Sequence, residues 1–92
     1  MRVKVKLFAA FRETFGGEWR EIELKSGATM HDLLQDLCDT PQRQKRLFDE
    51  SGKLRRDVKL IKSRRRITLS KEEEAALVDG DVVAMFPPIL GG

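Results

Sequence analysis

Hydrophobic and polar residues alternate strictly at the start of the chain. Val3, Val5 and Leu7 fall on one face of an extended backbone, and basic residues occupy the positions between them. A two-residue period is typical of a strand that is covered on one side. We therefore predict a strand over residues 2–8 and a second over residues 18–24, paired as an antiparallel hairpin.

The spacing of the apolar residues changes between these two strands. Phe8, Phe11 and Phe15 lie three and four positions apart, as on one face of a helix. We predict a short helical turn over residues 9–15. The pair Gly16-Gly17 then lets the chain turn sharply into the second strand.

The strongest helical pattern follows the second strand. Thr29 has the side chain of an N-cap residue, and Asp32 stands three positions later as its partner in a capping box. Apolar residues continue at helical spacing, namely Met30, Leu33, Leu34, Leu37 and Cys38. This pattern predicts the main helix, which Pro41 interrupts, and a second short helix over residues 42–49.

The second half of the chain alternates between short apolar and strongly charged stretches. Two short strands are predicted over residues 57–61 and 67–69, joined by a charged turn over residues 62–66. Ser70 can cap a helical turn over residues 71–78, where the early glutamates suit the helix dipole.

The last apolar run, residues 82–86, follows a turn at residues 79–81. It is almost uninterrupted, which indicates a central strand buried on both faces, and Pro87-Pro88 must end its pairing. The element order is then β-β-α-(α)-β-β-α-β, which is the layout of an α+β, β-grasp (ubiquitin-like) fold. We expect a mixed, twisted sheet of four or five strands around one main helix, with short extra helices, in a domain over residues 1–86.

Composition restricts the possible functions further. The 92 residues suffice for one domain with a small core, and 40% hydrophobic with 36% charged residues suit a globular chain. Neither a signal-peptide core nor a membrane-length apolar run is present, so we expect a cytoplasmic protein without a membrane partner. A single cysteine, Cys38, and a single histidine, His31, argue against a disulfide or metal site. We expect Cys38 to be a small buried hydrophobic residue and His31 to be a solvated residue in the first turn of the main helix.

Charge is concentrated in one segment of the chain. Residues 43–66 contain 11 Lys or Arg against 3 Asp or Glu, a net charge of +8. This basic stretch is either a solvated face or a surface for an acidic protein partner. Nucleic-acid binding is the weaker alternative, because Phe48 is the only aromatic residue of the stretch and the chain has no tyrosine to stack on bases.

The candidate chemistry lies at the end of the chain, where residues 87–92 form a tail ending in Gly91-Gly92. Without Cβ atoms, two glycines allow an extended backbone to enter a narrow channel in a partner enzyme. There the terminal carboxylate of Gly92 could be adenylated, after which a persulfide could displace AMP and leave a thiocarboxylate. All the catalytic groups can belong to the partner, so we do not expect the domain to be an enzyme by itself.

The residues before this glycine pair suit capture by a partner. Pro87-Pro88 fixes two φ angles and lacks N–H donors, which favours an extended chain and lowers the entropy lost on binding. Phe86, Ile89 and Leu90 supply apolar anchors next to it. We predict that residues 86–91 bind partners and that Gly92 carries the reactive carboxylate.

Both ends of the chain resemble one known family. The closing residues 79–92, with Phe86-Pro87-Pro88 and the terminal Gly91-Gly92, and the opening residues 3–13 are similar to the MoaD/ThiS sulfur carriers, above all to the MoaD-type small subunit of molybdopterin synthase. The resemblance implies that Gly92 is activated by an E1-like adenylyltransferase with MgATP and receives sulfur from a persulfide sulfurtransferase. No cofactor bound by the chain itself is implied.

The same resemblance implies an acceptor for the sulfur. The thiocarboxylate of Gly92 would serve the large subunit of molybdopterin synthase in making the molybdenum or tungsten cofactor. Two alternatives remain open from the sequence: a sulfur carrier for thiamine or cysteine synthesis, and a ubiquitin-like protein modifier. The modifier would use the same tail to form isopeptide bonds with lysines.

Overall fold

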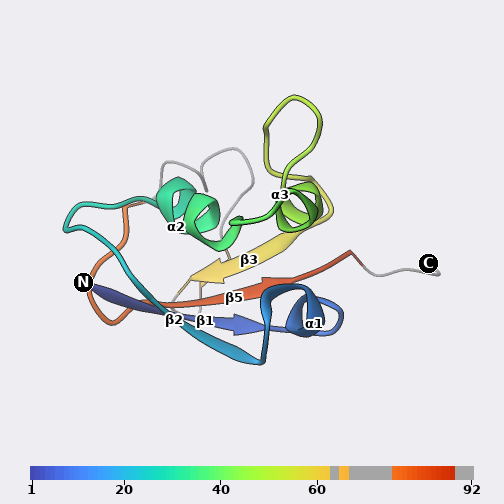
Figure 1. The fold of residues 1–92 in the computed structure, drawn as a ribbon. Coiled ribbons are helices and arrows are strands. Elements are labelled where there is room, and N and C mark those ends of the chain that lie inside the picture. Colours follow the sequence, from blue (N-terminus) through green and yellow to red (C-terminus); the bar gives the residue numbers. More distant parts are fainter. Residues whose placement is uncertain (63–64, 67–75, 89–92) are drawn as a thin grey trace.

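The computed structural model describes residues 1–62, 65–66 and 76–88. Its elements are β1 (Arg2–Leu7), α1 (Phe11–Phe15), β2 (Trp19–Glu23), α2 (Met30–Leu37), α3 (Pro41–Leu47), β3 (Lys59–Lys62), β4 (Arg65–Arg66) and β5 (Val82–Phe86). Figure 1 shows α2 and α3 over one face of a twisted sheet and α1 at the end of β1. The arrangement confirms the predicted β-grasp fold. None of the helices within these ranges has the length and apolar character needed to span a bilayer.

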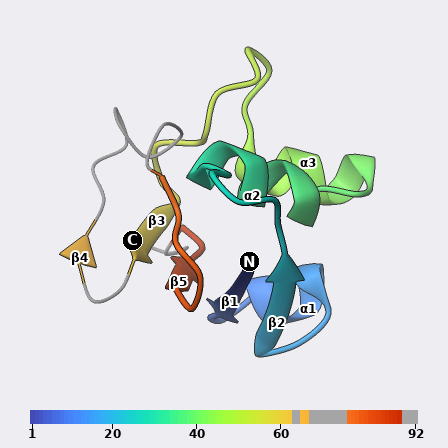
Figure 2. The same cartoon turned by 90° about the vertical axis from the view of Figure 1, so that its left-hand side faces the viewer.

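In the described part of the chain, five strands form a mixed sheet with the order β2-β1-β5-β3-β4 (Figure 2). β1 and β2 are antiparallel, as predicted, with Val3 opposite Ile22. β5 lies between β1 and β3, parallel to the first and antiparallel to the second. The last strand is therefore central, and the chain leaves the sheet from its middle.

The core lies between the sheet and the two helices above it. Val3, Val5 and Leu7 of β1 are completely buried, which confirms the face assigned to them by the alternating pattern. The other sheet and helix residues that are completely buried include Met30, Leu33, Leu34, Leu47, Val83 and Met85. Burying one such side chain stabilises the fold by about 1.5–3 kcal/mol, so this layer is the main source of stability.

The capping box that begins α2 is present as predicted. The Thr29 hydroxyl accepts a hydrogen bond from the Asp32 amide at 3.3 Å, and the Asp32 carboxylate accepts one from the Thr29 amide at 2.9 Å. These two hydrogen bonds give partners to backbone N–H groups that would otherwise be unpaired at the start of the helix.

The second helix differs from its predicted bounds. Thr40 caps α3 and Pro41 occupies its first turn, so Pro41 begins this helix, and the helix ends at Leu47 instead of residue 49. Proline is tolerated at this position because the missing N–H would have no partner within the helix.

The predicted turn over residues 62–66 is wrong in part. Lys62 of β3 pairs with Arg65 of β4, and Ile61 pairs with Arg66. A run of charged residues does not prevent backbone pairing at the edge of a sheet, where side chains can reach water. The predicted strand over residues 67–69 lies outside the described residues.

Two further bounds differ from the prediction. The strand predicted over residues 57–61 is β3, at Lys59–Lys62. The helical turn predicted over residues 71–78 does not extend over its last residues, because Ala76 forms an antiparallel bridge with Thr29 and Leu77 donates its amide to Ala28. Residues 71–75 lie outside the described ranges.

The expectation that β5 is buried on both faces is also wrong. Val83 and Met85 are completely buried, whereas Val82 is 37% exposed and Ala84 and Phe86 are half-buried. The reason is that α2 and α3 lie over the same face of the sheet (Figure 1). Alternate residues of β5 therefore point to an open face.

The predicted turn over residues 79–81 ties the start of β5 to the start of β1. The Asp79 carboxylate accepts a hydrogen bond from the Arg2 amide at 2.7 Å, and the Gly80 amide donates to the Arg2 carbonyl at 2.9 Å. Gly80 adopts a left-handed φ of 86°, which favours glycine. This anchor fixes the direction in which β5 carries the chain toward its C-terminal end.

Candidate functional site

The candidate site lies where the chain leaves β5. Phe86 is the last residue of this strand, and Pro87 and Pro88 follow it outside any strand, as predicted. All three are half-buried, on the side of the molecule opposite the N-terminus (Figure 1). The predicted site residues Ile89, Leu90, Gly91 and Gly92 lie outside the described residues, and their roles stay predictions.

The ring of Phe86 is held by an aromatic partner from the first strand. β1 and β5 run in parallel with Leu7 beside Met85, so the next residues, Phe8 and Phe86, lie side by side. Their rings stack with centroids 4.2 Å apart and an interplanar angle of 13°. The Phe8 amide also donates to the Met85 carbonyl at 3.2 Å. Together these contacts fix the direction in which the chain leaves the sheet.

Further apolar side chains continue from this pair across the open face of the sheet. One row of paired residues crosses the sheet from β2 to β3. In this row Lys6 lies between Trp19 and Ala84, and Ala84 lies between Lys6 and Ile61. We call Phe8, Trp19, Ile61, Ala84 and Phe86 the open-face patch. Trp19 is 49% exposed, and large aromatic side chains of this kind are enriched among the residues that carry binding energy at partner surfaces.

Lys6 lies between two aromatic residues of the open-face patch. Its ammonium group lies 5.2 Å from the centre of the Phe8 ring and 5.3 Å from that of Trp19. At these distances the cation is attracted by both ring faces. Lys6 thus contacts two aromatic rings of the patch, and with Lys59, the cross-strand neighbour of Phe86, it adds positive charge to this face.

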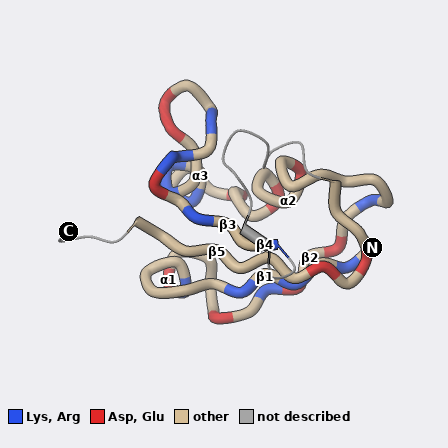
Figure 3. The backbone as a smooth tube through the Cα atoms, turned by 180° about the vertical axis from the view of Figure 1, so that it is seen from behind, with Lys and Arg blue, Asp and Glu red and all other residues tan. Residues whose placement is uncertain are grey.

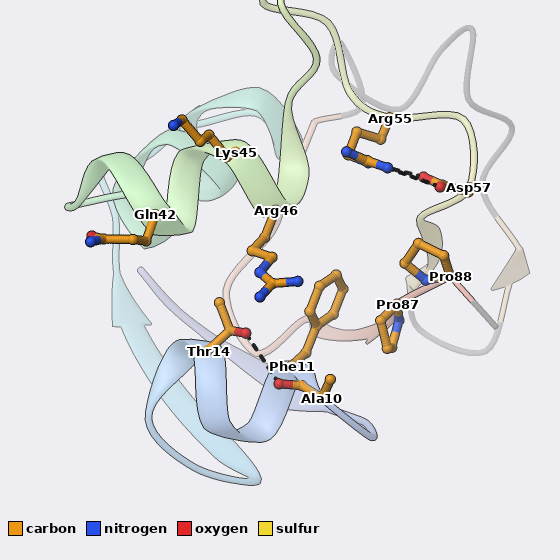
Figure 4. Close-up of a pocket in the computed structure, with 10 residues that line it drawn as sticks. All are labelled: Ala10, Phe11, Thr14, Gln42, Lys45, Arg46, Arg55, Asp57, Pro87 and Pro88. Carbon is orange, nitrogen blue, oxygen red and sulfur yellow. Dashed lines mark hydrogen bonds and ion pairs between the residues drawn. The ribbon is translucent and has the colours of Figure 1, made fainter. Parts of the chain in front are cut away.

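Two hollows meet at the start of the tail. One, of about 450 Å³, lies beside Phe8 and Phe86. The other, of about 440 Å³, lies between α1 and α3 (Figure 4). Both are lined by Pro87 and Pro88. The start of the tail is therefore accessible from two sides, and a partner could grip it from either.

The assignment of Phe86 to a partner surface stays a prediction, and the sequence did not indicate its neighbour Phe8 as part of the same site. Phe8 was grouped instead with Phe11 and Phe15 on one helical face. That grouping is wrong for Phe8, because Phe11 and Phe15 pack edge to face in the core while Phe8 is still part of the β1 alternation. A sequence signal for Trp19 existed, since the two-residue period of a strand over residues 18–24 places Trp19 on the other face of the sheet from the buried Ile22.

The two residues considered for thiol or metal chemistry lie away from the tail. Cys38 packs against the core but is half-buried instead of fully buried, and desolvation by this burial raises the pKa of its thiol to about 11. His31 is half-buried instead of solvated, with its edge toward Phe48, and its Nδ1 atom has no hydrogen-bond partner within the described ranges. No cluster of His, Cys, Asp or Glu suited to a metal ion occurs among the described residues.

The described site can present the tail to a partner protein. Pro87 and Pro88 cannot donate backbone hydrogen bonds, so they cannot extend the ladder of β5. Their fixed φ angles make Pro87-Pro88 itself a stiff segment. The patch beside them offers the contact area with which a partner could orient that segment.

Comparison with known proteins agrees with this description. The family model described as the ThiS family matches residues 5–92. Small archaeal modifier protein 3 of Haloferax volcanii is 30% identical over 92 residues, which cover all of both chains.

Solved structures with the same fold include the crystal structure of SAMP1 from Haloferax volcanii. It superimposes with a TM-score of 0.85 at 28% identity, covering all of both chains. A Pyrococcus furiosus protein assigned as molybdopterin converting factor subunit 1 has a TM-score of 0.71 and 34% identity, covering 97% of this chain and 99% of its own. The chain therefore belongs to the ThiS family of ubiquitin-like sulfur carriers and modifiers.

Proposed function

We propose that the chain is a ubiquitin-like protein modifier whose Gly92 carboxylate is activated and joined to lysines of other proteins. The observation that carries the proposal is the stiff Pro87-Pro88 segment between the open-face patch and a terminal glycine pair. The similarity to small archaeal modifier protein 3 over the whole of both chains supports it.

The first chemical step is activation of an unreactive group. A carboxylate resists attack by nucleophiles, so an oxygen of Gly92 would first attack the α-phosphorus of MgATP in an E1-like adenylyltransferase. Pyrophosphate leaves and an acyl-adenylate remains. A lysine amine can then attack the acyl carbon, lose its proton and displace AMP, which completes an isopeptide bond.

The described residues have a positioning role in this scheme. The open-face patch would dock on the adenylyltransferase, and Phe86 would orient the tail at the edge of that contact. Because Pro87-Pro88 is already restricted, fewer conformations are lost when the tail enters the active site. Gly91 and Gly92 would fit where bulkier residues could not.

A second candidate uses the same activated tail for sulfur transfer. The terminal sulfur of a persulfide sulfurtransferase would displace AMP, and a second thiol would break the resulting S–S bond. The products are a thiocarboxylate at Gly92 and an oxidised disulfide on the donor. The identity of 34% to the Pyrococcus furiosus protein favours this chain acting with the large subunit of molybdopterin synthase.

The product distinguishes the two candidates. An N-terminally tagged chain would be expressed in its own organism, and the tagged proteins purified and digested with chymotrypsin. Cleavage after Leu90 leaves Gly91-Gly92 on a modified lysine, where mass spectrometry can detect it. The modifier function predicts such lysines, and a chain lacking Gly92 should yield none. Free chain carrying only a thiocarboxylate would overturn the modifier function and support the sulfur carrier.

A further inference from the structure

The groove between α1 and α3 lies on the opposite side of the tail from the open-face patch. It is lined by Ala10, the N-cap of α1, by Phe11 and Thr14 of α1, by Gln42, Lys45 and Arg46 of α3, and by Arg55, Asp57, Pro87 and Pro88. In Figure 4 the Arg46 guanidinium lies beside Phe11 and Thr14, and Arg55 with Asp57 lies on the side of Pro88. The groove therefore combines basic and apolar side chains next to the start of the tail.

The two guanidinium groups differ in how they are used. Arg55 forms a salt bridge of 3.2 Å with Asp57, and this guanidinium lowers the pKa of the Asp57 carboxyl. Arg46 is exposed and points into the groove, and within the described ranges no acidic residue pairs with it (Figure 4). Arg46 is thus available for an anion from another molecule.

Other residues of the basic stretch 43–66 serve the fold instead. Arg43 donates to the Thr14 carbonyl at 2.9 Å and contacts Asp39 at 2.6 Å, which ties α3 to α1. Lys62 donates to the Ala76 carbonyl at 3.0 Å. Figure 3 shows basic segments on and after α3, on the side where the chain leaves β5. Of the described basic residues of this stretch, Lys45 and Arg46 line the groove without a described acidic partner.

We propose that this groove binds an acidic segment of the enzyme that activates the tail. The inference rests on the proposed function, because that enzyme must hold the chain at Pro87 and Pro88, which line the groove. A carboxylate presented there can form a two-pronged contact with Arg46, while the half-buried Pro87 and Pro88 accept an apolar neighbour. The partner would then grip the tail from both sides.

The structure favours a protein segment over a nucleic acid in this groove. Stacking on bases requires exposed aromatic rings, and Phe48, the one aromatic residue of the basic stretch, is only 4% exposed. Phe11, which lines the groove, is 2% exposed. What the groove offers is a cationic wall beside a small apolar one, which suits an acidic side chain next to an apolar residue.

Charge reversal tests the proposal with a matched control. Arg46→Glu and Arg56→Glu change the net charge equally, and Arg56 is an exposed residue that does not line the groove. Affinity for the E1-like adenylyltransferase of the same organism would be measured by calorimetry without ATP. We expect Arg46→Glu to weaken binding more than about tenfold and Arg56→Glu less than about threefold. If Arg46→Glu does not fold, Arg46→Gln replaces it. This variant removes the charge without reversing it, and it should still weaken binding more than Arg56→Glu does.

Zero-length cross-linking locates the acidic group. A carbodiimide joins carboxylates to amines but not to guanidinium groups, so Arg46→Lys should gain a cross-link from position 46 to an Asp or Glu of the enzyme. Equal effects of the two reversals, or cross-links only to a second copy of the chain, would overturn the groove proposal and leave the proposed function intact. Failure of the unmodified chain to bind the enzyme would overturn both.

Discussion

Phe8 and Phe86 stack with ring centroids 4.2 Å apart, although they are 78 positions apart in the sequence. The contact arises because β1 and β5 run side by side in parallel, with Leu7 beside Met85, so that the next residue of each segment is a phenylalanine. It places an aromatic pair at the point where the tail begins. A partner that recognises this pair would also receive the following residues in a defined direction.

The first prediction concerns docking through this aromatic pair. Replacing Phe86 with Asp should weaken binding to the activating enzyme by about 2 kcal/mol or more, because anchor residues contribute at this level. That corresponds to about thirtyfold in Kd, which calorimetry can measure.

Val82→Asp is the matched control for Phe86→Asp. Val82 lies on the same strand and the same open face but at the opposite end, and it is 37% exposed. It should affect binding much less. If the two variants bind equally and both remain folded by circular dichroism, Phe86 is not an anchor.

The second prediction separates two contacts of one arginine. Arg43→Ala should lower the free energy of unfolding by about 2 kcal/mol, because its largely buried guanidinium donates a charged hydrogen bond to the Thr14 carbonyl. Asp39→Ala should cost less than about 1 kcal/mol, because the Asp39 side chain is 60% exposed. Urea unfolding compares them, and a larger effect at Asp39 would contradict this assignment.

The sequence was informative where a local rule determines the structure. The Thr29–Asp32 capping box needs only residues three positions apart, and the β1 alternation needs only that one face is covered. Both were predicted correctly. The same reasoning failed where the answer depends on contacts between distant segments. The open face of β5 exists because α2 and α3 both lie on the other face of the sheet. No local sequence pattern predicts on which face a helix packs.

The groove beside the tail shows the same limit. Arg43 and Arg46 are near neighbours in one basic stretch, yet one ties two helices together and the other faces a groove. Composition identified the excess charge and suggested an acidic protein partner. Only the packing of α1 against α3 distinguishes the structural arginine from the available one.

The third prediction concerns the acid sensitivity of the main helix. Hydrogen bonds from the Thr29 amide and hydroxyl lower the pKa of Asp32. A lowered pKa contributes stability that is complete above the unfolded value of about 4 and is lost as the pH falls through the folded value. Asp32→Asn should therefore lower Tm at pH 6, and the difference from the unmodified chain should shrink toward pH 2.5. A difference independent of pH would contradict the titration of Asp32.

The fourth prediction concerns the single thiol. Burial raises the pKa of Cys38 to about 11, so little of the reactive thiolate is present near neutral pH. Iodoacetamide should alkylate the folded chain at pH 8.5 more than about tenfold more slowly than the urea-unfolded chain. Alkylation at equal rates would show that Cys38 is not protected. Cys38→Ser, followed by mass spectrometry, identifies any reaction elsewhere.

The most direct test of the account is the fate of the Gly92 carboxylate. The purified chain would be incubated with the E1-like adenylyltransferase of its organism and MgATP, and the intact mass recorded before and after addition of hydroxylamine, which traps acyl-adenylates as hydroxamates. Adenylation of Gly92 predicts a hydroxamate mapped to this residue. A chain that lacks Gly92, or that carries one added residue after it, should give none. No hydroxamate with an enzyme that activates another family member, or equal trapping in the extended chain, would contradict it.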